Sequence, residues 1–237
     1  MKNVVKLFKA HSVSVSGVKG SGKDILMSNV VARRRGYYIG NIDYQTRARF
    51  VHLNFSKLRV GNSYKNFLDG SVKEYVYPYP DGTDIYISDC GIYFPAQYCN
   101  ELNRDYKDLP VFLALSRQLG DCRVHTNAQY LGRVWDKIRE QSDVYIVCQN
   151  CRVFGRLVVQ KIRIFERYES ALQNAIPFRV PMPIFGNSMA RNQWKLAKAN
   201  YEQSNGKIRE RTLIYFNKSK YDTRAFREIL EQGEKND

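Results

Sequence analysis

Eight residues near the N-terminus, GVKGSGKD at positions 17–24, have the spacing of a phosphate-binding loop. In the pattern Gly-x-x-x-x-Gly-Lys, glycines let backbone N–H groups turn toward phosphate oxygens, and the lysine reaches the terminal phosphates. We therefore predict a nucleotide-binding site here; the alternative is a glycine-rich turn that only connects two elements. The residues expected to hold the nucleotide are Gly17, Gly20, Ser21, Gly22, Lys23 and Asp24.

Asp24 stands where this pattern usually closes with Ser or Thr, the residue that binds Mg²⁺ through its hydroxyl. A carboxylate is also a good ligand for a hard cation, and negative charge is stabilised at the start of a helix. We expect Asp24 to hold Mg²⁺ directly or through a metal-bound water. The alternative is a helix-start residue with no metal role.

A second carboxylate, Asp89, ends the apolar run that begins at residue 84. In P-loop enzymes an acid at the end of a neighbouring strand holds the metal, so Asp89 is the second predicted Mg²⁺ ligand. Cys90 follows, where many ATPases have a Glu that orients the attacking water, and a thiol is a poor base. Asp43, at the end of the run YIGNI, is the candidate base, because a parallel neighbouring strand would end at the same edge. Without a base, hydrolysis would be slow.

These side chains need a frame of strands and helices to bring them together. A predicted strand at 11–17, the loop, a helix at 23–35 and a strand at 37–42 form a βαβ unit. Further strands are predicted at 84–91, 122–129 and 143–149, a helix at 109–120, and a long alternating stretch at 156–168. This alternation predicts an α/β fold with a mainly parallel sheet flanked by helices. The phosphate-binding loop adds the P-loop NTPase type, and the resemblance given below implies its RecA-like (ASCE) form.

The amino-acid composition of the sequence changes at about residue 170. The stretch at 176–188 is rich in proline and cannot be regular helix. The residues after it are basic and polar, with modest helical periodicity. We therefore predict a P-loop ATPase domain at 1–170, followed at 171–237 by a proline-containing linker and a small, peripheral, basic C-terminal extension.

The charge of the chain indicates a polyanionic partner. Its 237 residues include 38 Lys and Arg against 23 Asp and Glu, a net charge of +15. Such an excess favours nucleic acid first, here double-stranded DNA, and an anionic membrane surface second. A solvated basic surface without a specific partner is the plain alternative.

Neither a membrane span nor a signal peptide is expected. No run of eighteen apolar residues occurs, and the basic start lacks a long apolar region and a cleavage site. The five cysteines are an odd number and several lie in apolar runs, which is typical of a reduced protein in the cytoplasm, that of a host cell if the protein is viral. The pair in CQNC at 148–151 has half of a zinc-binding spacing and no second pair, so zinc is not favoured.

Taken together, these motifs and their order resemble the ATPase domain of zonula occludens toxin (Zot)-type phage proteins, which belong to the FtsK–HerA branch of P-loop motors. The likeness covers roughly residues 10–165, and its order is more specific than any one motif. Besides the loop, the residues that carry it are Asn41, Ile42, Asp89, Phe94, Pro95, Arg117, Gly120 and Gln129. Asp24 and Cys90 depart from the family pattern, which puts fast hydrolysis in doubt but not nucleotide binding.

The resemblance implies ATP and Mg²⁺ as cofactors and roles for four residues. Lys23 would bind the β- and γ-phosphates and Asp89 the metal. Gln129 would sense the γ-phosphate or the attacking water; the alternative is a strand-end residue in a turn. Arg117 would stabilise transition-state charge across a subunit interface; the alternative is a surface arginine.

The function implied is that of a phage or mobile-element motor ATPase that translocates or packages DNA as a homo-oligomeric ring, with a portal-type or other phage structural protein as a further partner. Two alternatives stay open. One is a Zot-like virion assembly or extrusion ATPase that reaches the membrane through a partner, since the chain shows no span of its own. The other is a nucleotide-binding switch or scaffold with weak hydrolysis, as Cys90 suggests.

Overall fold

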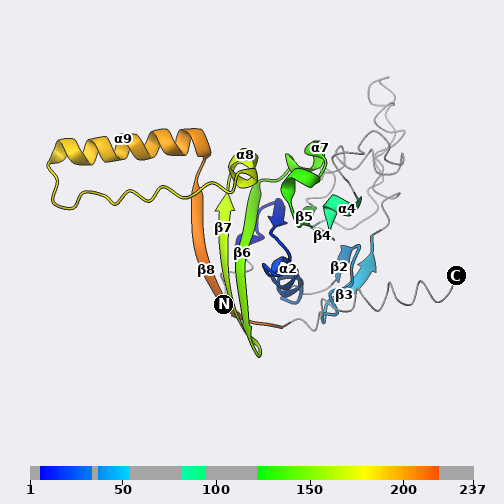
Figure 1. The fold of residues 1–237 in the computed structure, drawn as a ribbon. Helices are drawn as coiled ribbons and strands as arrows, with labels where there is room; N and C mark the ends of the chain where they lie inside the picture. Colours follow the sequence, from blue (N-terminus) through cyan, green and yellow to red (C-terminus); the bar gives the residue numbers. More distant parts are fainter. Residues whose placement is uncertain (1–5, 34–36, 54–81, 94–121, 219–237) are drawn as a thin grey trace, which may run out of the picture.

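One eight-stranded sheet forms the centre of the molecule, with strand order β3-β2-β4-β5-β1-β6-β7-β8 (Figure 1). The structure is a computed structural model that describes residues 6–33, 37–53, 82–93 and 122–218. The strands are β1 (Ser12–Ser16), β2 (Tyr37–Gly40), β3 (Arg49–His52), β4 (Asp84–Ile87), β5 (Arg123–Ala128), β6 (Val144–Phe154), β7 (Leu157–Phe165) and β8 (Ile208–Phe216). The predicted helix at 109–120 lies outside the described residues.

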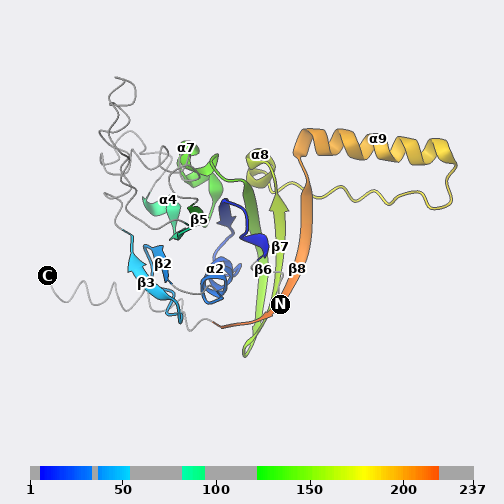
Figure 2. The same ribbon diagram turned by 180° about the vertical axis from the view of Figure 1, so that it is seen from behind.

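The sheet has a parallel part and an antiparallel part. From β3 to β6 every neighbouring pair is parallel, whereas β6, β7 and β8 pair antiparallel. The predicted α/β fold with a mainly parallel sheet is confirmed. The antiparallel strands are the longest of the sheet and form a curved ribbon at one side of the molecule (Figures 1 and 2).

Helix α2 starts directly after the glycine-rich loop and lies on the concave side of that ribbon (Figure 1). It buries Leu26, Met27, Val30 and Val31 in the main core, together with residues of β1 and β7. Apart from α9, the remaining helices are short and connect strands. The helices are α2 (Lys23–Val31), α4 (Cys90–Tyr93), the 3-10 turn η3 (Leu131–Arg133), α7 (Asp136–Arg139), α8 (Tyr168–Leu172) and α9 (Ser188–Asn205).

The C-terminal part of the chain departs from the expectation of a peripheral extension. Strand β8 pairs with β7 along its whole length, from Phe165 opposite Ile208 to Leu157 opposite Phe216. It also buries Leu213 and Tyr215 in the main core. Residues 208–216 are therefore part of the sheet, and sequence alone missed this because their alternation is interrupted by charged residues. The domain boundary at residue 170 stays a prediction.

In the part of the chain that connects β7 to β8, helix α9 projects away from the sheet (Figure 1). The segment that precedes α9 runs alongside this helix. Asn187 caps the helix by accepting a hydrogen bond from the backbone N–H of Ala190. The indole of Trp194 donates to the carbonyl of Val180, 2.8 Å away, so helix and segment hold each other. Of the helices that the structure describes, not one combines the length and the apolar character needed to span a bilayer.

Candidate nucleotide-binding site

The loop at 17–24 connects β1 to α2, as predicted. Gly20 and Gly22 both have φ of +83°, a conformation that residues with a side chain rarely adopt. Gly22 is the N-cap of α2, and no side chain caps the helix there. The N–H groups of the first turn are thus left for an outside acceptor, which is the arrangement that binds phosphate.

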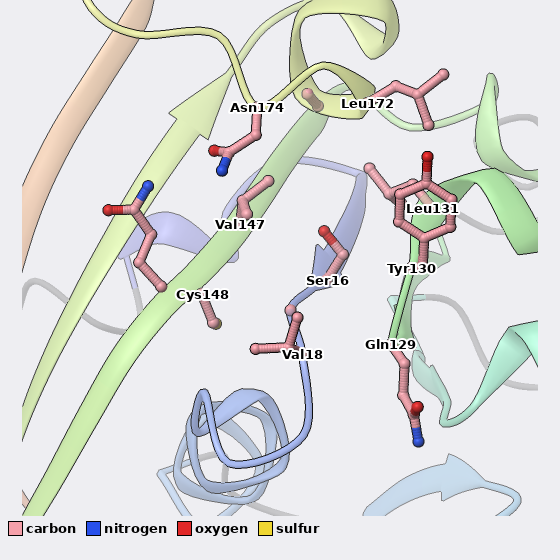
Figure 3. A pocket seen from close by; sticks show the side chains of 12 residues that line it. Ser16, Val18, Gln129, Tyr130, Leu131, Val147, Cys148, Leu172 and Asn174 are labelled. Atoms are coloured by element: carbon pink, nitrogen blue, oxygen red, sulfur yellow. The ribbon is translucent and has the colours of Figure 1, made fainter.

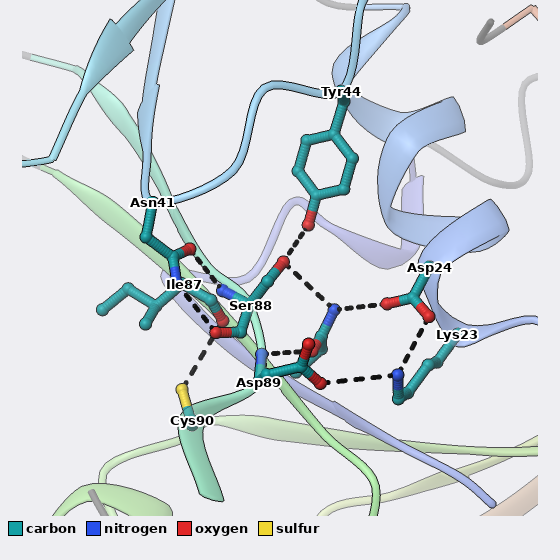
Figure 4. Close-up of polar contacts among 9 residues, drawn as sticks. Lys23, Asp24, Asn41, Tyr44, Ile87, Ser88, Asp89 and Cys90 are labelled. Carbon is teal, nitrogen blue, oxygen red and sulfur yellow. Dashed lines mark hydrogen bonds and ion pairs between the residues drawn. The ribbon is translucent and has the colours of Figure 1, made fainter. Parts of the chain in front are cut away.

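Lys23 lies between two carboxylates (Figure 4). Its Nζ is 2.9 Å from Oδ2 of Asp24 and 3.6 Å from Oδ1 of Asp89, and the lysine side chain is only 8% exposed. Asp89 itself has a φ of +52°, which re-aims the chain as it leaves β4. The structure therefore brings together the three residues that sequence singled out for phosphate and metal.

The electrostatics of Asp89 reflect this crowded position. Burial raises the pKa of its carboxyl above the ordinary value, Lys23 works in the opposite direction, and the charge of Asp24 raises it further. Two partly buried carboxylates that share one lysine carry one negative charge in excess. A second cation at the carboxylates would relieve that excess.

Asn127, near the end of β5, joins the two carboxylates and was missed by sequence reasoning. Its amide nitrogen donates to Oδ1 of Asp24 over 3.1 Å, and its amide oxygen accepts from the backbone N–H of Asp89 over 2.8 Å. The side chain is 1% exposed. The signal in the sequence was a polar amide in an otherwise buried strand, two residues before the chosen Gln129.

A second amide fixes the ends of β2 and β4 relative to each other. Asn41 donates to the carbonyl of Ser88 over 2.9 Å and accepts from its backbone N–H over 2.8 Å. The hydroxyls of Tyr44 and Ser88 also hydrogen-bond to each other (Figure 4). Asn41, quoted above for the family resemblance, thus has a structural role in orienting the residue that precedes Asp89.

Strand β7 of the antiparallel ribbon contacts the glycine-rich loop through one side chain. Gln160 of β7 is fully buried, and its amide nitrogen donates to the carbonyls of Ser21 and Gly22 at 3.1 and 3.0 Å. A Cβ on Gly22 would lie 2.6 Å from Sγ of Cys151 and 2.9 Å from that amide nitrogen. Only glycine fits this close approach. Sequence reasoning missed Gln160, whose signal was a lone polar residue at a core position of an alternating strand.

Cys90 cannot act as a base in this arrangement. The residue is 1% exposed, and its thiol donates to the carbonyl of Ile87 over 3.5 Å. Burial raises the pKa of the thiol far above its ordinary value, so it stays protonated. The side chain at this position is directed into the protein and not toward the space beside Lys23 (Figure 4).

Two other predicted site residues, Asp43 and Gln129, make no hydrogen bond or ion pair with this cluster within the described part of the chain. Asp43 accepts hydrogen bonds from the hydroxyl of Tyr38 and the backbone N–H of Gln45, so its carboxylate is engaged in a local turn. Gln129 is exposed and lines a cavity of about 300 Å³ beside Gly17 (Figure 3). Its amide points away from the rest of that lining. Arg117 lies outside the described residues, and the roles given to these three residues stay predictions.

The residues present fit ATP with Mg²⁺. The uncapped first turn of α2 offers N–H donors, and Lys23 offers a cation. Asp24 and Asp89 offer the oxygen ligands that Mg²⁺ prefers. The hydroxyl of Ser21, buried in the loop, has no hydrogen-bond partner within the described part of the chain. The donor set is thus suited to a phosphate chain and a hard cation.

Comparison with known proteins finds likeness in fold only. No protein-family model and no curated protein matches the chain. Among solved structures, the N-terminal domain of zonular occludens toxin from Neisseria meningitidis is 12% identical with a TM-score of 0.44, and the match covers 92% of this chain and 97% of that one. The DNA-packaging ATPase B204 from Sulfolobus turreted icosahedral virus is 13% identical with a TM-score of 0.38, covering 66% and 92%.

A third similar structure is EssC (ATPases 2 and 3) from Geobacillus thermodenitrificans, 9% identical with a TM-score of 0.40; the match covers 83% of this chain and 44% of that one. A domain of the Zot type, which the sequence was expected to resemble, is thus among the structures of similar fold. At these identities and TM-scores the likeness carries no conclusion about activity, which depends on the residues of the site.

Proposed function

We propose that this chain is a Mg²⁺-dependent P-loop ATPase that moves or packages double-stranded DNA as an oligomeric ring. One observation carries the ATPase part of the proposal. Lys23 lies 2.9 Å from Asp24 and 3.6 Å from Asp89 at the uncapped start of a helix that follows a glycine-rich loop.

The chain's own residues divide the work of hydrolysis. ATP, bound together with Mg²⁺, would be the substrate whose phosphoanhydride bond is cleaved. Lys23 would hold the terminal phosphates, and Asp24, which now contacts Lys23, would hold the metal. Asp89 is the second metal ligand. Asn127 keeps the two carboxylates in register through its contacts with the side chain of Asp24 and the backbone of Asp89.

The DNA and ring parts of the proposal rest on different support. The net charge of +15 supports a polyanionic partner. The ring rests on the family resemblance, in which a neighbouring subunit supplies an arginine, with Arg117 as the candidate. An action at a membrane through a partner protein also stays a prediction, as does a cytoplasmic location.

A nucleotide-dependent switch is the second candidate, favoured by the burial of Cys90. Because this thiol is protonated and directed inward, it leaves the attacking water without the usual base. Such a protein would bind ATP tightly and hydrolyse it too slowly to drive movement. Both candidates share the same nucleotide site.

The deciding experiment measures ATP hydrolysis with and without double-stranded DNA, together with the oligomeric mass in solution. A motor shows hydrolysis that DNA stimulates and that Lys23→Ala and Asp89→Ala abolish, in a particle larger than one chain. ATP binding without hydrolysis in either condition identifies the switch. Failure to bind ATP with Mg²⁺ at all refutes both candidates.

A further inference from the structure

A cavity of about 620 Å³ lies at the C-terminal end of α2, away from the nucleotide site. Three separate surface segments meet there: the connection between β2 and β3, the β6–β7 turn, and the residues after β8. Figures 1 and 2 show the end of β8 and the β6–β7 turn at the same end of the molecule, opposite α8. Besides Ala32, the lining consists of Gln45, Thr46, Arg47, Arg156, Asn217 and Lys218.

The charges in this lining are all positive. Arg47, Arg156 and Lys218 are exposed, and no acidic residue of the described chain lines the cavity with them. Within the described ranges, none of the three side chains has a hydrogen bond or ion pair. Elsewhere the chain does pair such groups: Glu210 contacts both Lys161 and Arg163. Three like charges around one cavity repel each other and favour an anionic ligand.

The cavity is held by hydrogen bonds of the backbone and of Asn29, which is fully buried in α2. Asn29 donates to the side-chain oxygen of Asn217 over 2.7 Å and accepts from the backbone N–H of Lys218 over 2.9 Å. The backbone N–H of Asn217 donates to the carbonyl of Arg156 over 2.7 Å. The backbone positions of Arg156 and Lys218, from which two of the three cationic side chains extend, are therefore fixed by Asn29 and Asn217.

One feature of α2 could work against an anion, namely the negative end of its dipole. Arg33 counters this end, because its guanidinium donates to the carbonyl of Asn29 over 2.7 Å and to that of Phe216 over 2.9 Å. The helix terminus is thus covered by a positive group. Arg33 and the three cations of the lining therefore make the electrostatic potential around the cavity positive.

We propose that this cavity binds phosphate groups of a nucleic-acid backbone, with Arg47, Arg156 and Lys218 as the contacts. Guanidinium groups match phosphate oxygens in pairs, and Gln45 and Thr46 add neutral hydrogen-bonding groups, as backbone-positioning sites do. A backbone is favoured over a small anion because the cations are exposed on separate segments and the whole chain carries +15. The assignment rests on the proposed action on DNA and gives it a location.

The position of the cavity relates it to the nucleotide site. Helix α2 has nine residues, so roughly 13 Å of helix separate its two ends. Lys23 begins this helix and the cavity lies at its far end. A DNA backbone bound there would contact the far end of the helix whose first turn presents Lys23 and Asp24 to ATP.

The test is binding of a short labelled DNA duplex, followed by fluorescence anisotropy over a series of KCl concentrations. The test variant is Arg47→Gln/Arg156→Gln/Lys218→Gln. A matched control removes three exposed cations elsewhere, Lys195→Gln/Lys207→Gln/Arg211→Gln, so both variants lose the same charge. Circular dichroism checks that each variant is folded. Inorganic tripolyphosphate serves as a small-anion probe in calorimetry.

In the test variant, the slope of log affinity against log salt should become shallower by about 2 to 3, because each phosphate contact contributes roughly 0.9. The control should keep the slope of the unchanged protein. Equal slopes in the two variants would overturn the assignment. So would an unchanged duplex affinity in a test variant that has lost tripolyphosphate binding, since the cavity would then serve a small anion. If the unchanged protein binds no ATP but the slope still drops only in the test variant, the proposed ATPase fails and this site stands.

Discussion

Tyr215 of β8 donates a hydrogen bond to the side-chain oxygen of Gln160 over 2.8 Å, and Gln160 holds two carbonyls of the glycine-rich loop. Both side chains are almost fully buried. Burial raises the pKa of Tyr215 far above its ordinary value, so the hydroxyl stays a donor. The orientation of the Gln160 amide is thereby determined, with its oxygen toward Tyr215 and its nitrogen toward the loop.

Tyr215→Phe should weaken ATP binding although residue 215 lies outside the loop. The change leaves the buried oxygen of Gln160 without its donor, which costs about 1 to 2 kcal/mol of folding stability. ATP affinity falls only by the part of this cost that misplaces the loop, so the loss should be at most about tenfold, which corresponds to 1.4 kcal/mol of binding free energy. Titration with a fluorescent ATP analogue measures this. Tyr201→Phe is the control, because it removes a hydroxyl that bonds to Ile176 beside α9; an equal loss of affinity there would contradict the prediction.

Asn127→Ala should reduce the turnover number by about 100-fold, the effect typical of losing one well-placed donor. The reason is that Asp24 and the backbone of Asp89 both lose their partner. Gln129→Ala, two residues later on an exposed position, should change turnover by a few fold only. Steady-state kinetics of the two variants compare them directly. A larger loss in Gln129→Ala would support the role that sequence predicted for that residue.

Mg²⁺ affinity should fall with falling pH at a midpoint above 3.8, the ordinary value for an aspartate. Burial, and then the charge of Asp24, raise the pKa of Asp89, while Lys23 lowers it. A protonated carboxyl does not ligate Mg²⁺, so binding is lost as pH falls through the raised pKa. Calorimetric titration of Mg²⁺ at several pH values measures the midpoint. A midpoint at or below 3.8 would show that Lys23 dominates.

The same shift predicts how Asp89 affects folding. An acid whose pKa is raised on folding contributes stability below its unfolded value, and that contribution disappears as pH rises through the folded value. Ionised Asp89 is therefore a cost at neutral pH. Asp89→Asn should leave the melting temperature of the nucleotide-free protein unchanged or higher at pH 7 while abolishing hydrolysis. A clear fall in melting temperature would mean that the contact with Lys23 outweighs desolvation.

Cys90→Glu, which restores the residue expected at this position, should destabilise the protein and not accelerate hydrolysis. The side chain is 1% exposed and its thiol faces the carbonyl of Ile87, so a carboxylate there would be buried without a cation. We expect a loss of about 3 kcal/mol or more in urea unfolding, against about 1 kcal/mol for Cys90→Ala. Faster hydrolysis in a stable Cys90→Glu protein would contradict this orientation.

That Lys23, Asp24 and Asp89 lie together could be predicted from the order of the motifs, whereas their roles in binding stay predictions. The loop, the helix after it and the acid after β4 follow one another in the sequence at distances that are ordinary for P-loop folds. Lys23, Asp24 and Asp89 could therefore be named in advance. Asp43 was placed correctly after a strand, but its carboxylate serves a turn with Tyr38. A strand end indicates an edge of the sheet, and does not indicate which way a side chain turns.

The missed residues depend on contacts between distant parts of the chain. Gln160 lies 138 residues from Gly22 in sequence. Strand β8 was hidden because charged residues such as Arg209 and Arg211 interrupt its apolar pattern, and its pairing with β7 became visible only in the sheet. Cys90 was read as a missing base, whereas the structure shows it as part of the core.

The contact between Gln160 and the loop has a consequence for the newly made chain. Ribosomes release a protein from its N-terminus, so the glycine-rich loop emerges long before the strand that supports it. The carbonyl of Gly22 already accepts from the backbone N–H of Leu26 in α2, but the contacts of Gln160 with Ser21 and Gly22 form only after β7 is made, and Gln160 is oriented only after Tyr215. The support that β7 and β8 give to the loop therefore forms late in synthesis, long after the loop itself has left the ribosome.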